Sequence, residues 1–324
     1  MEFTKNYIAE SDLLKFINQQ YNIKGERIRL YRTSGGRVFF IQSPSGRKVF
    51  KLYLPTVTSA AIQTTRIIKY LDSCAYPIVK IIPTASDALY VTVERPEGSC
   101  IGVLFEYASG ICIWAWNALY DTEQEVVHPL TRQFSAQVGL MHRLMENYDE
   151  PLIQRGSRES IFDITIHQLR LDGYDETKVR DLEEYGNELW AILNKCRGGF
   201  YHADMHPGNT KYRNGQFTWM DFDRACMSYS VMDIGWLLTT DWLHYHKESL
   251  DRSRRLFDEV YAGYSMEQSM TGNEIEAALH SAAIIHFEAL GLDAKMRNTG
   301  YAPWLADREY EWLMHWRKAC NTLL

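Results

Sequence analysis

The stretch YHADMHPGNTKYRNGQFTWMDFD, residues 201–223, decides how this chain is interpreted. It lacks the helical periodicity of the sequence around it, and its Asn214-Gly215 dipeptide is typical of a two-residue hairpin turn. The pattern predicts a loop, a strand over TKYR, a tight turn, and a second strand over FTWMDF. The stretch is also rich in polar residues that take part in catalysis or bind metals. These are His202, Asp204, His206, Asn209, Asp221 and Asp223.

This set of side chains suits phosphoryl transfer. The reaction needs a group that positions the acceptor hydroxyl, and oxygen ligands for a Mg²⁺ ion that bridges the phosphates. Asp204 can supply the first, and Asn209 and Asp221 the second, because a tight hairpin brings residues near its two ends opposite each other. Asp, Asn and Gly are also common in turns that have no such role. The Pro-Gly before Asn209 and the apolar strand that ends in Asp-Phe-Asp favour the catalytic interpretation.

Outside this stretch the chain has a strand-rich beginning and a helical remainder. Residues 26–107 contain five runs typical of strands, with one helical segment at 57–72, and a short amphipathic helix is expected at 11–20. Helical spacing prevails after Gly110, in the segments 123–148, 175–197, 247–268, 274–291 and 305–323. We therefore expect an α+β, two-lobed fold of the protein-kinase type. Its N-lobe would span residues 1–109 and contain an antiparallel sheet, and its mainly helical C-lobe would span 110–324.

Composition excludes some classes of function. A chain of 324 residues is long enough for two lobes, and its net charge of −6 argues against a non-specific nucleic-acid binder. The six cysteines are scattered without a C-x-x-C pair, which is typical of a reduced, cytoplasmic protein. No apolar run is long enough for a membrane span, and the acidic N-terminus does not resemble a signal peptide.

Two motifs carry a family resemblance. HADMHPGN at 202–209 and MDFDRA at 220–225 resemble the signature of the aminoglycoside phosphotransferase and choline kinase superfamily, commonly H-G-D-x-H-x-x-N followed by I-D-F-D. VLFEYASG, GLMHRL and VMDIGWLL are similar to its hinge strand, its Leu-His helix and the helix after its metal loop, in the same order. Shorter pieces, such as Lys51-Leu-Tyr and the PWL that begins at Pro303, resemble the bacterial stress-response kinases of this superfamily. The resemblance implies an ATP-dependent phosphotransferase.

For the nucleotide, the resemblance implies contacts in the N-lobe. Lys51 matches the strand lysine that holds the α- and β-phosphates. Gly35 and Gly36 match a shortened glycine-rich loop over the phosphates. The hinge, whose backbone would bond adenine, corresponds to Glu106, Tyr107 and Ala108.

For the reaction centre, the resemblance makes Asp204 the catalytic aspartate and Asn209 and Asp221 the magnesium ligands. His206 would either contact a phosphate or cap the loop. His202 and Asp233 would brace the catalytic loop through hydrogen bonds. Asp223 would be a second metal ligand or the partner of a basic residue such as Arg224.

The sequence departs from the kinase pattern beside Lys51. Kinases usually place a glutamate on the N-lobe helix to pair with this lysine, but no acidic residue lies between Lys51 and Asp72. Gln63, Thr64 and Thr65 occupy the region instead, so we expect only a neutral amide or hydroxyl to hold the lysine, and the lysine to be mobile without nucleotide and ordered with it. A nucleotide-binding pseudokinase without turnover is therefore one alternative function.

The acceptor is expected to be a small molecule with a hydroxyl group. Only eleven residues separate Asp221 from Asp233, too few for the long activation segment on which protein kinases dock peptides. A protein Ser/Thr kinase of the stress-response type is the other alternative. Aromatic and charged residues of the C-terminal helices would line the acceptor site and suit a compact, cationic ligand, although most aromatics there are expected in the core. They are Trp236, Asp241, Trp242, His286, Glu288, Trp304 and Tyr310.

Overall fold

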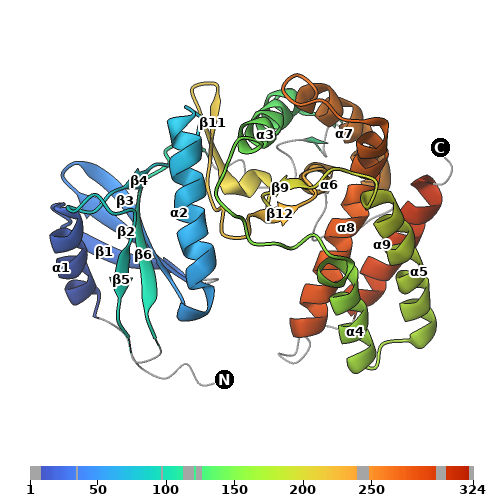
Figure 1. Ribbon diagram of the computed structural model, residues 1–324, viewed down its shortest axis with the longest axis horizontal. Helices are drawn as coiled ribbons and strands as arrows, with labels where there is room; N and C mark the ends of the chain where they lie inside the picture. Colours follow the sequence, from blue (N-terminus) through green and yellow to red (C-terminus); the bar gives the residue numbers. More distant parts are fainter. Residues whose placement is uncertain are drawn as a thin grey trace. The chain divides into compact units, whose positions relative to one another are not determined.

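The chain folds into two compact units. One comprises Met1–Ile111 and Lys211–Asp223, and the other Cys112–Thr210 and Arg224–Leu324. A computed structural model describes residues 9–33, 36–95, 98–111, 120–121, 126–238, 248–296 and 304–320 (Figure 1). The units differ from the expected lobes, 1–109 and 110–324, in that residues 211–223 group with the first unit.

The first unit is built on an antiparallel sheet with strand order β1-β2-β3-β6-β4, and β5 also pairs with β6. Five strands were predicted, and β4 is the additional one because two residues between prolines give no readable pattern. The sheet strands are β1 (Arg27–Arg32), β2 (Gly36–Ser43), β3 (Gly46–Tyr53), β4 (Ile81–Ile82), β5 (Val91–Val93) and β6 (Cys100–Glu106). Two helices, α1 (Glu10–Tyr21) and α2 (Thr58–Ser73), complete this part of the unit.

The hairpin of β10 (Thr210–Arg213) and β11 (Gln216–Trp219) forms around the predicted turn, although its second strand ends at Trp219 instead of continuing to Phe222 as predicted. Its second strand is tied to the first unit through the backbone of Trp219. The Trp219 carbonyl accepts from Val79 N at 2.8 Å, and Trp219 N donates to the Pro77 carbonyl at 2.9 Å. The Trp219 side chain is fully buried. These contacts explain why the hairpin groups with the sheet-bearing unit.

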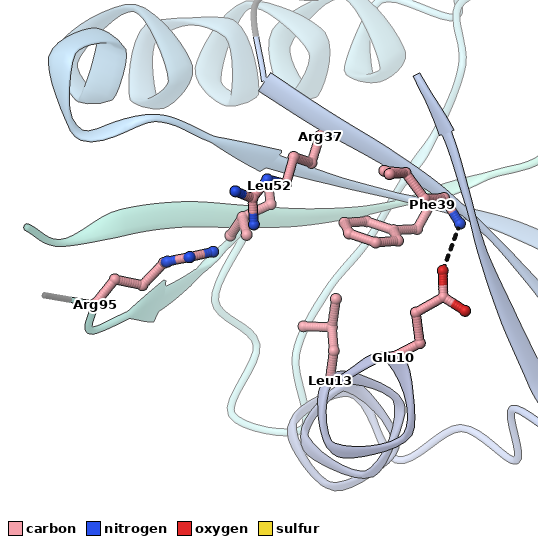
Figure 2. Close-up of a pocket in the computed structure, with 7 residues that line it drawn as sticks. Glu10, Leu13, Arg37, Phe39, Leu52 and Arg95 are labelled. Atoms are coloured by element: carbon pink, nitrogen blue, oxygen red, sulfur yellow. Dashed lines mark hydrogen bonds between the residues drawn. The ribbon is translucent and has the colours of Figure 1, made fainter. Parts of the chain in front are cut away.

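Helix α1 covers the apolar side of the sheet because its buried residues repeat at helical spacing. Leu13, Ile17 and Tyr21 pack in one cluster with strand residues such as Phe39 and Phe50. At the start of the helix, Glu10 accepts a hydrogen bond from Leu30 N at 3.0 Å (Figure 2). The cavity drawn in Figure 2 is about 20 Å³, room for about one water molecule, so it is no ligand site.

The second unit is mainly helical, as predicted. Helix α8 packs against α4, α5, α6 and α9, while α3 packs against α7 (Figure 1). The segment η2 (Glu159–Asp163), a π-helix, and α4 were not predicted. The helices are α3 (Thr131–Met145), α4 (Ile164–Leu171), α5 (Glu176–Leu193), α6 (Met232–Leu238), α7 (Glu248–Tyr264), α8 (Gly272–Met296) and α9 (Trp304–Cys320). Short strand pairs are β9 (Gly199–Tyr201) with β12 (Cys226–Ser228) and β7 (Tyr120–Asp121) with β8 (Val126–Val127). Within the described ranges, no helix has the length and hydropathy needed to cross a bilayer.

Helices α6 and α8 approach so closely that only glycine fits at their contact. A Cβ atom on Gly235 would collide with the backbone carbonyl group of Ser281. Backbone atoms cannot move aside as a flexible side chain can, so a methyl group here must push the two helices apart.

We therefore expect Gly235→Ala to lower the free energy of unfolding by about 1–3 kcal/mol, the usual cost of overpacking a core. Gly272→Ala is the matched control, since a Cβ atom there meets nothing within 4 Å. Thermal unfolding of both variants checks this, and an unchanged midpoint for Gly235→Ala would contradict it.

Candidate active site

A buried carboxylate shapes the loop of residues 202–209, which the sequence predicts to be the catalytic loop. Asp233, the second residue of α6, is fully buried and accepts hydrogen bonds from the backbone N–H groups of His202 (2.8 Å) and Ala203 (3.1 Å). The same carboxylate lies 3.0 Å from Nε2 of His142, whose Nδ1 is 2.8 Å from the hydroxyl of Tyr264. Asp233 thus connects α6 and α3 to the end of β9, where the catalytic loop begins.

Ala203 has a backbone conformation that side chains seldom adopt. Its φ is +64°, in the left-handed region that favours glycine. The commoner form of the motif has glycine at this position, and the conformation supplies the reason. The hydrogen bond from Ala203 N to Asp233 offsets the strain and directs the chain into Asp204.

Asp204 is held from the far end of its own loop. Nδ2 of Asn209 donates to the Asp204 carboxylate and to its backbone carbonyl, both at 2.9 Å. A carboxylate and a carbonyl only accept, so the amide must turn its NH₂ group toward Asp204. Asn209 Oδ1 therefore points away and is available as a ligand. The Asp204 side chain itself is 25% exposed.

His206 lies between these two residues in the loop. Its Nδ1 accepts from Gly208 N at 3.1 Å and caps the short 3₁₀ turn η3 (Pro207–Asn209). An accepting Nδ1 leaves the proton of the neutral ring on Nε2, which lies 3.8 Å from Asp204 Oδ1. Two roles were expected for His206, a phosphate contact or a loop cap, and in this structure the side chain caps the loop.

The first unit holds a second charged cluster around Lys51. Lys51 Nζ is 2.8 Å from Asp221 Oδ1 and 2.5 Å from Asp223 Oδ2. The Tyr53 hydroxyl donates to Asp223 Oδ1 at 2.9 Å. Lys51 and Tyr53 lie two residues apart on β3 and so point to the same face of the sheet.

This cluster corrects one expectation about Lys51. The lysine was expected to be held only by a neutral group of α2 and to be mobile without nucleotide, but it forms ion pairs with two carboxylates from the loop after β11. Among the α2 residues in question, Thr64 instead donates to the backbone carbonyl of Phe222 at 3.1 Å. Asp223, which the sequence left between metal ligand and ion-pair partner, is an ion-pair partner of Lys51 in this structure.

Burial and the neighbouring charges both shift the pKa values of Lys51 and Asp223. Burial lowers the pKa of Lys51, but the charges of Asp221 and Asp223 and their hydrogen bonds outweigh it and leave that pKa raised. Burial raises the pKa of Asp223, and the nearby Asp221 charge adds to this, while Lys51 opposes it. Lys51 therefore stays protonated throughout the neutral range.

An apolar strip shares the sheet face of Lys51, and the sequence reasoning missed it. In the β2–β3 pairing, Val38 lies opposite Lys51 and Phe40 opposite Val49. Residues that alternate along paired strands lie on one face, so Val38, Phe40 and Val49 continue the face of Lys51. The alternating pattern of β2 and β3 was the signal that could have found them. At the end of this strip, Tyr107 packs edge-on against Phe40, with ring centroids 6.0 Å apart.

The other predicted nucleotide contacts fall at strand ends. Gly36 begins β2, and a Cβ atom there would lie 2.8 Å from the backbone oxygen of Leu52, so a side chain has no room. Gly35 lies outside the described residues. Glu106 ends β6 and forms an ion pair with Lys48 at 2.8 Å. Tyr107 and Ala108 follow β6, so their backbone groups lie beyond its strand pairing.

The residues of the predicted acceptor wall lie in different surroundings. Trp236 and Glu288 meet at the hydroxyl of Tyr201, three residues before Asp204. His286 is buried against Trp312 and 2.7 Å from Glu309, so it belongs to the core. Tyr310 donates to Asp181 of α5 at 2.6 Å. Asp241, Trp242 and the side chain of Trp304 lie outside what the structure describes.

The sequence matches a family model. The model describes a phosphotransferase enzyme family, and it matches residues 32–266, which include both charged clusters. A search of curated proteins gave no match.

Solved structures of small-molecule kinases share the fold. An amicoumacin kinase in complex with AMP-PNP and Ca²⁺ has a TM-score of 0.72 at 17% identity, over 97% of this chain and 94% of its own. A microcompartment-associated aminopropanol kinase has a TM-score of 0.74 at 12% identity, over 96% of each chain. For the choline kinase of Cryptosporidium parvum Iowa II the TM-score is 0.58 at 13% identity, over 92% and 89%. These likenesses confirm the predicted α+β, kinase-like fold class.

We expect Asp223→Asn to weaken nucleotide binding about 10–100-fold, as for loss of a hydrogen-bonded charge. If Asp221 binds a metal, as the sequence predicts, Asp223 is left as the carboxylate that holds Lys51, and the amide lacks the charge to do so. Titration calorimetry with AMP-PNP measures the effect. Tyr53→Phe is the control, because it removes only the hydroxyl that orients Asp223 and should weaken binding by less than about tenfold. Equal affinities of Asp223→Asn and wild type would show that Lys51 does not depend on Asp223.

Proposed function

The chain belongs to the phosphotransferase enzyme family, and we propose that it transfers the γ-phosphate of ATP to a hydroxyl group of a small molecule. The observation that carries this proposal is the Asp204–Asn209 pair. One amide fixes a partly exposed carboxylate and keeps its own oxygen free. A carboxylate in this state can take a proton from an acceptor hydroxyl.

In the first unit, Lys51 would bind the α- and β-phosphates. Two aspartates, 2.8 and 2.5 Å from Nζ, hold its ammonium group in position, so this group is already oriented before nucleotide binds. The apolar strip of Val38, Phe40 and Val49 continues the same face and offers a flat surface for the adenine ring. The backbone of Glu106, Tyr107 and Ala108 would bond the edge of the base, and Gly36 would lie near the phosphates together with Gly35.

In the second unit, Asp204 would position the acceptor. The acceptor oxygen forms a bond to the γ-phosphorus, the bond from that phosphorus to the β–γ bridging oxygen breaks, and ADP leaves. The hydroxyl proton passes to the Asp204 carboxylate. Asn209 holds that carboxylate in place at 2.9 Å, and His206 keeps the loop closed by capping η3.

The donor set also fits a magnesium ion. Carboxylate and amide oxygens are the hard ligands that Mg²⁺ prefers, and it usually keeps only one or two carboxylates besides phosphates and water. Asn209 Oδ1 and the carboxylate of Asp221 would each contribute such an oxygen. When bound, Mg²⁺ neutralises charge on the phosphates. His202 and Asp233 support the loop and do not need to contact the substrate.

A small acceptor is favoured over a protein substrate. The segment between Asp221 and Asp233 has only eleven residues, and within it β12 covers Cys226–Ser228 and α6 begins at Met232. Little chain is left to form a platform for a peptide. The likeness to amicoumacin, aminopropanol and choline kinases agrees with a small acceptor.

Asp204→Asn is expected to lower kcat by about 10²–10⁴-fold, the range for loss of a general base, with AMP-PNP affinity within a few-fold of wild type. The acceptor screen that defines the activity measures ATP consumption over amino alcohols, sugars, aminoglycosides and a generic protein substrate. Asp12→Asn on the exposed face of α1 is the matched control. A variant that retained most of its kcat would remove Asp204 from the reaction. Phosphate transfer only to protein would favour the Ser/Thr kinase alternative.

Asp221→Ala and Asn209→Ala are each expected to abolish the dependence of nucleotide affinity on magnesium. The phosphates alone cannot supply the oxygen ligands that these side chains contribute. Calorimetry with AMP-PNP at several Mg²⁺ concentrations tests this, with the exposed Asp258→Ala on α7 as control. If both variants kept the magnesium dependence of wild type, the metal assignment would be wrong.

A further inference from the structure

A series of neighbouring side chains, joined by ion-pair, ring and hydrogen-bond contacts, leads from Asp204 to a guanidinium group within the second unit. His206 Nε2 lies 3.8 Å from Asp204, and the His206 ring faces Trp236 with centroids 6.1 Å apart. Trp236 Nε1 donates to the Tyr201 hydroxyl at 3.3 Å. Tyr201 and Arg224 meet at one carboxylate on α8, that of Glu288. Its Oε1 is 3.5 Å from Tyr201, and its Oε2 accepts from Arg224 Nη2 at 2.8 Å.

Arg224 is fixed on one side and open on the other. A guanidinium group carries five N–H donors in a planar fork. Across the described ranges of the chain, the structure gives Arg224 a hydrogen bond through Nη2 alone, to Glu288. The Arg224 side chain is 39% exposed, so its other donors are accessible. Glu288 therefore orients the guanidinium group while it occupies a donor of Nη2.

The carboxylate that pairs with Arg224 is itself held by a hydrogen bond. Glu288 is itself oriented by Tyr201, whose hydroxyl is in turn bonded by the nearly buried Trp236. Burial lowers the pKa of Arg224, but the charges of Glu288 and Asp204, the Tyr201 hydroxyl and the hydrogen bond to Glu288 together outweigh it and leave that pKa raised. The guanidinium is therefore always charged. The Asp204 charge also acts on both Arg224 and Glu288, as expected for groups around one site.

We propose that Arg224 is a carboxylate-binding residue of the acceptor site, so that the acceptor is a small molecule with both a hydroxyl group and a carboxylate. The inference rests on the proposed function. A planar guanidinium fork matches the two oxygens of a carboxylate and binds them through parallel hydrogen bonds. Because Glu288 already holds the fork, little conformational freedom is lost on binding. The acceptor hydroxyl then lies at Asp204 and its carboxylate at Arg224. This differs from the purely cationic ligand expected from the sequence, because Arg224 compensates the charge of Glu288.

Pairs of acceptors that differ only in the carboxylate test the proposal. L-Serine is compared with ethanolamine, and L-homoserine with 3-amino-1-propanol, by ATP consumption. For the wild type we expect kcat/KM to be at least about tenfold higher for the acid of each pair, as for a charge-assisted hydrogen bond. In Arg224→Gln the ratio should fall to about one, with KM for ATP within about twofold of wild type.

The controls separate this role from a structural one. Arg197→Gln removes a comparable ion pair, that with Glu274 at 3.0 Å, and should leave the ratio unchanged. If Arg224→Gln lowered kcat/KM equally for both members of a pair, Arg224 would be a structural residue and the proposal would fail. A rise in KM for ATP with an unchanged ratio would instead assign Arg224 to the nucleotide phosphates. A wild type that phosphorylates alcohols without preference for the acid would overturn the proposal and leave the phosphotransferase function standing.

A binding measurement decides the case in which none of these compounds is turned over. Calorimetric titration in the presence of AMP-PNP and Mg²⁺ compares D-glycerate with glycerol. Binding of glycerate that is absent for glycerol and lost in Arg224→Gln supports the carboxylate site. Absence of glycerate binding to the wild type overturns it.

Discussion

The buried carboxylate of Asp233 is the constraint on which the catalytic loop depends. It has no access to water, so its charge must be balanced by hydrogen bonds, and it receives them from His202 N, Ala203 N and the ring of His142. These bonds hold Ala203 at a positive φ, a conformation that costs about 1–3 kcal/mol when it is not otherwise supported. Because Asp204 follows directly, its direction is set by Asp233. Asn209 then fixes the carboxylate from the other end of the loop.

Lys51 and Arg224 share one feature: an oppositely charged or polar neighbour fixes the position of each. Lys51 is held by Asp221 and Asp223, and Asp223 is oriented by Tyr53. Arg224 is held by Glu288. A group that is already oriented loses less conformational entropy when it binds a phosphate or a carboxylate. In the proposed reaction this matters most for Lys51, because the one acidic residue of helix α2, Asp72, pairs with Lys80 instead.

The absence of an acidic residue between Lys51 and Asp72 thus has a local compensation. The usual kinase arrangement pairs the strand lysine with a helix glutamate. Here the partners come from the Asp-Phe-Asp motif, and α2 contributes Thr64, which bonds the backbone of Phe222 between the two aspartates. Helix and motif remain coupled through a neutral hydrogen bond. The sequence departure that favoured a pseudokinase is therefore weaker evidence once the carboxylates around Lys51 are known.

The sequence by itself determined the features that depend on local order. The α+β class, the hairpin at Asn214-Gly215, most helices and the candidate residues Asp204, Asn209 and Asp221 follow from periodicity, turn chemistry and a specific motif. Contacts between distant residues were decided only in the tertiary structure. Lys51 meets Asp221 and Asp223 across some 170 positions, and Arg224 meets Glu288 across 64. Strand β4 was missed because two residues are too few to show the alternating pattern of a strand. His286 was placed in the acceptor wall but lies in the core, because Trp312 and Glu309 pack against it. Local patterns reveal which groups the chain has available, but packing decides which of them meet.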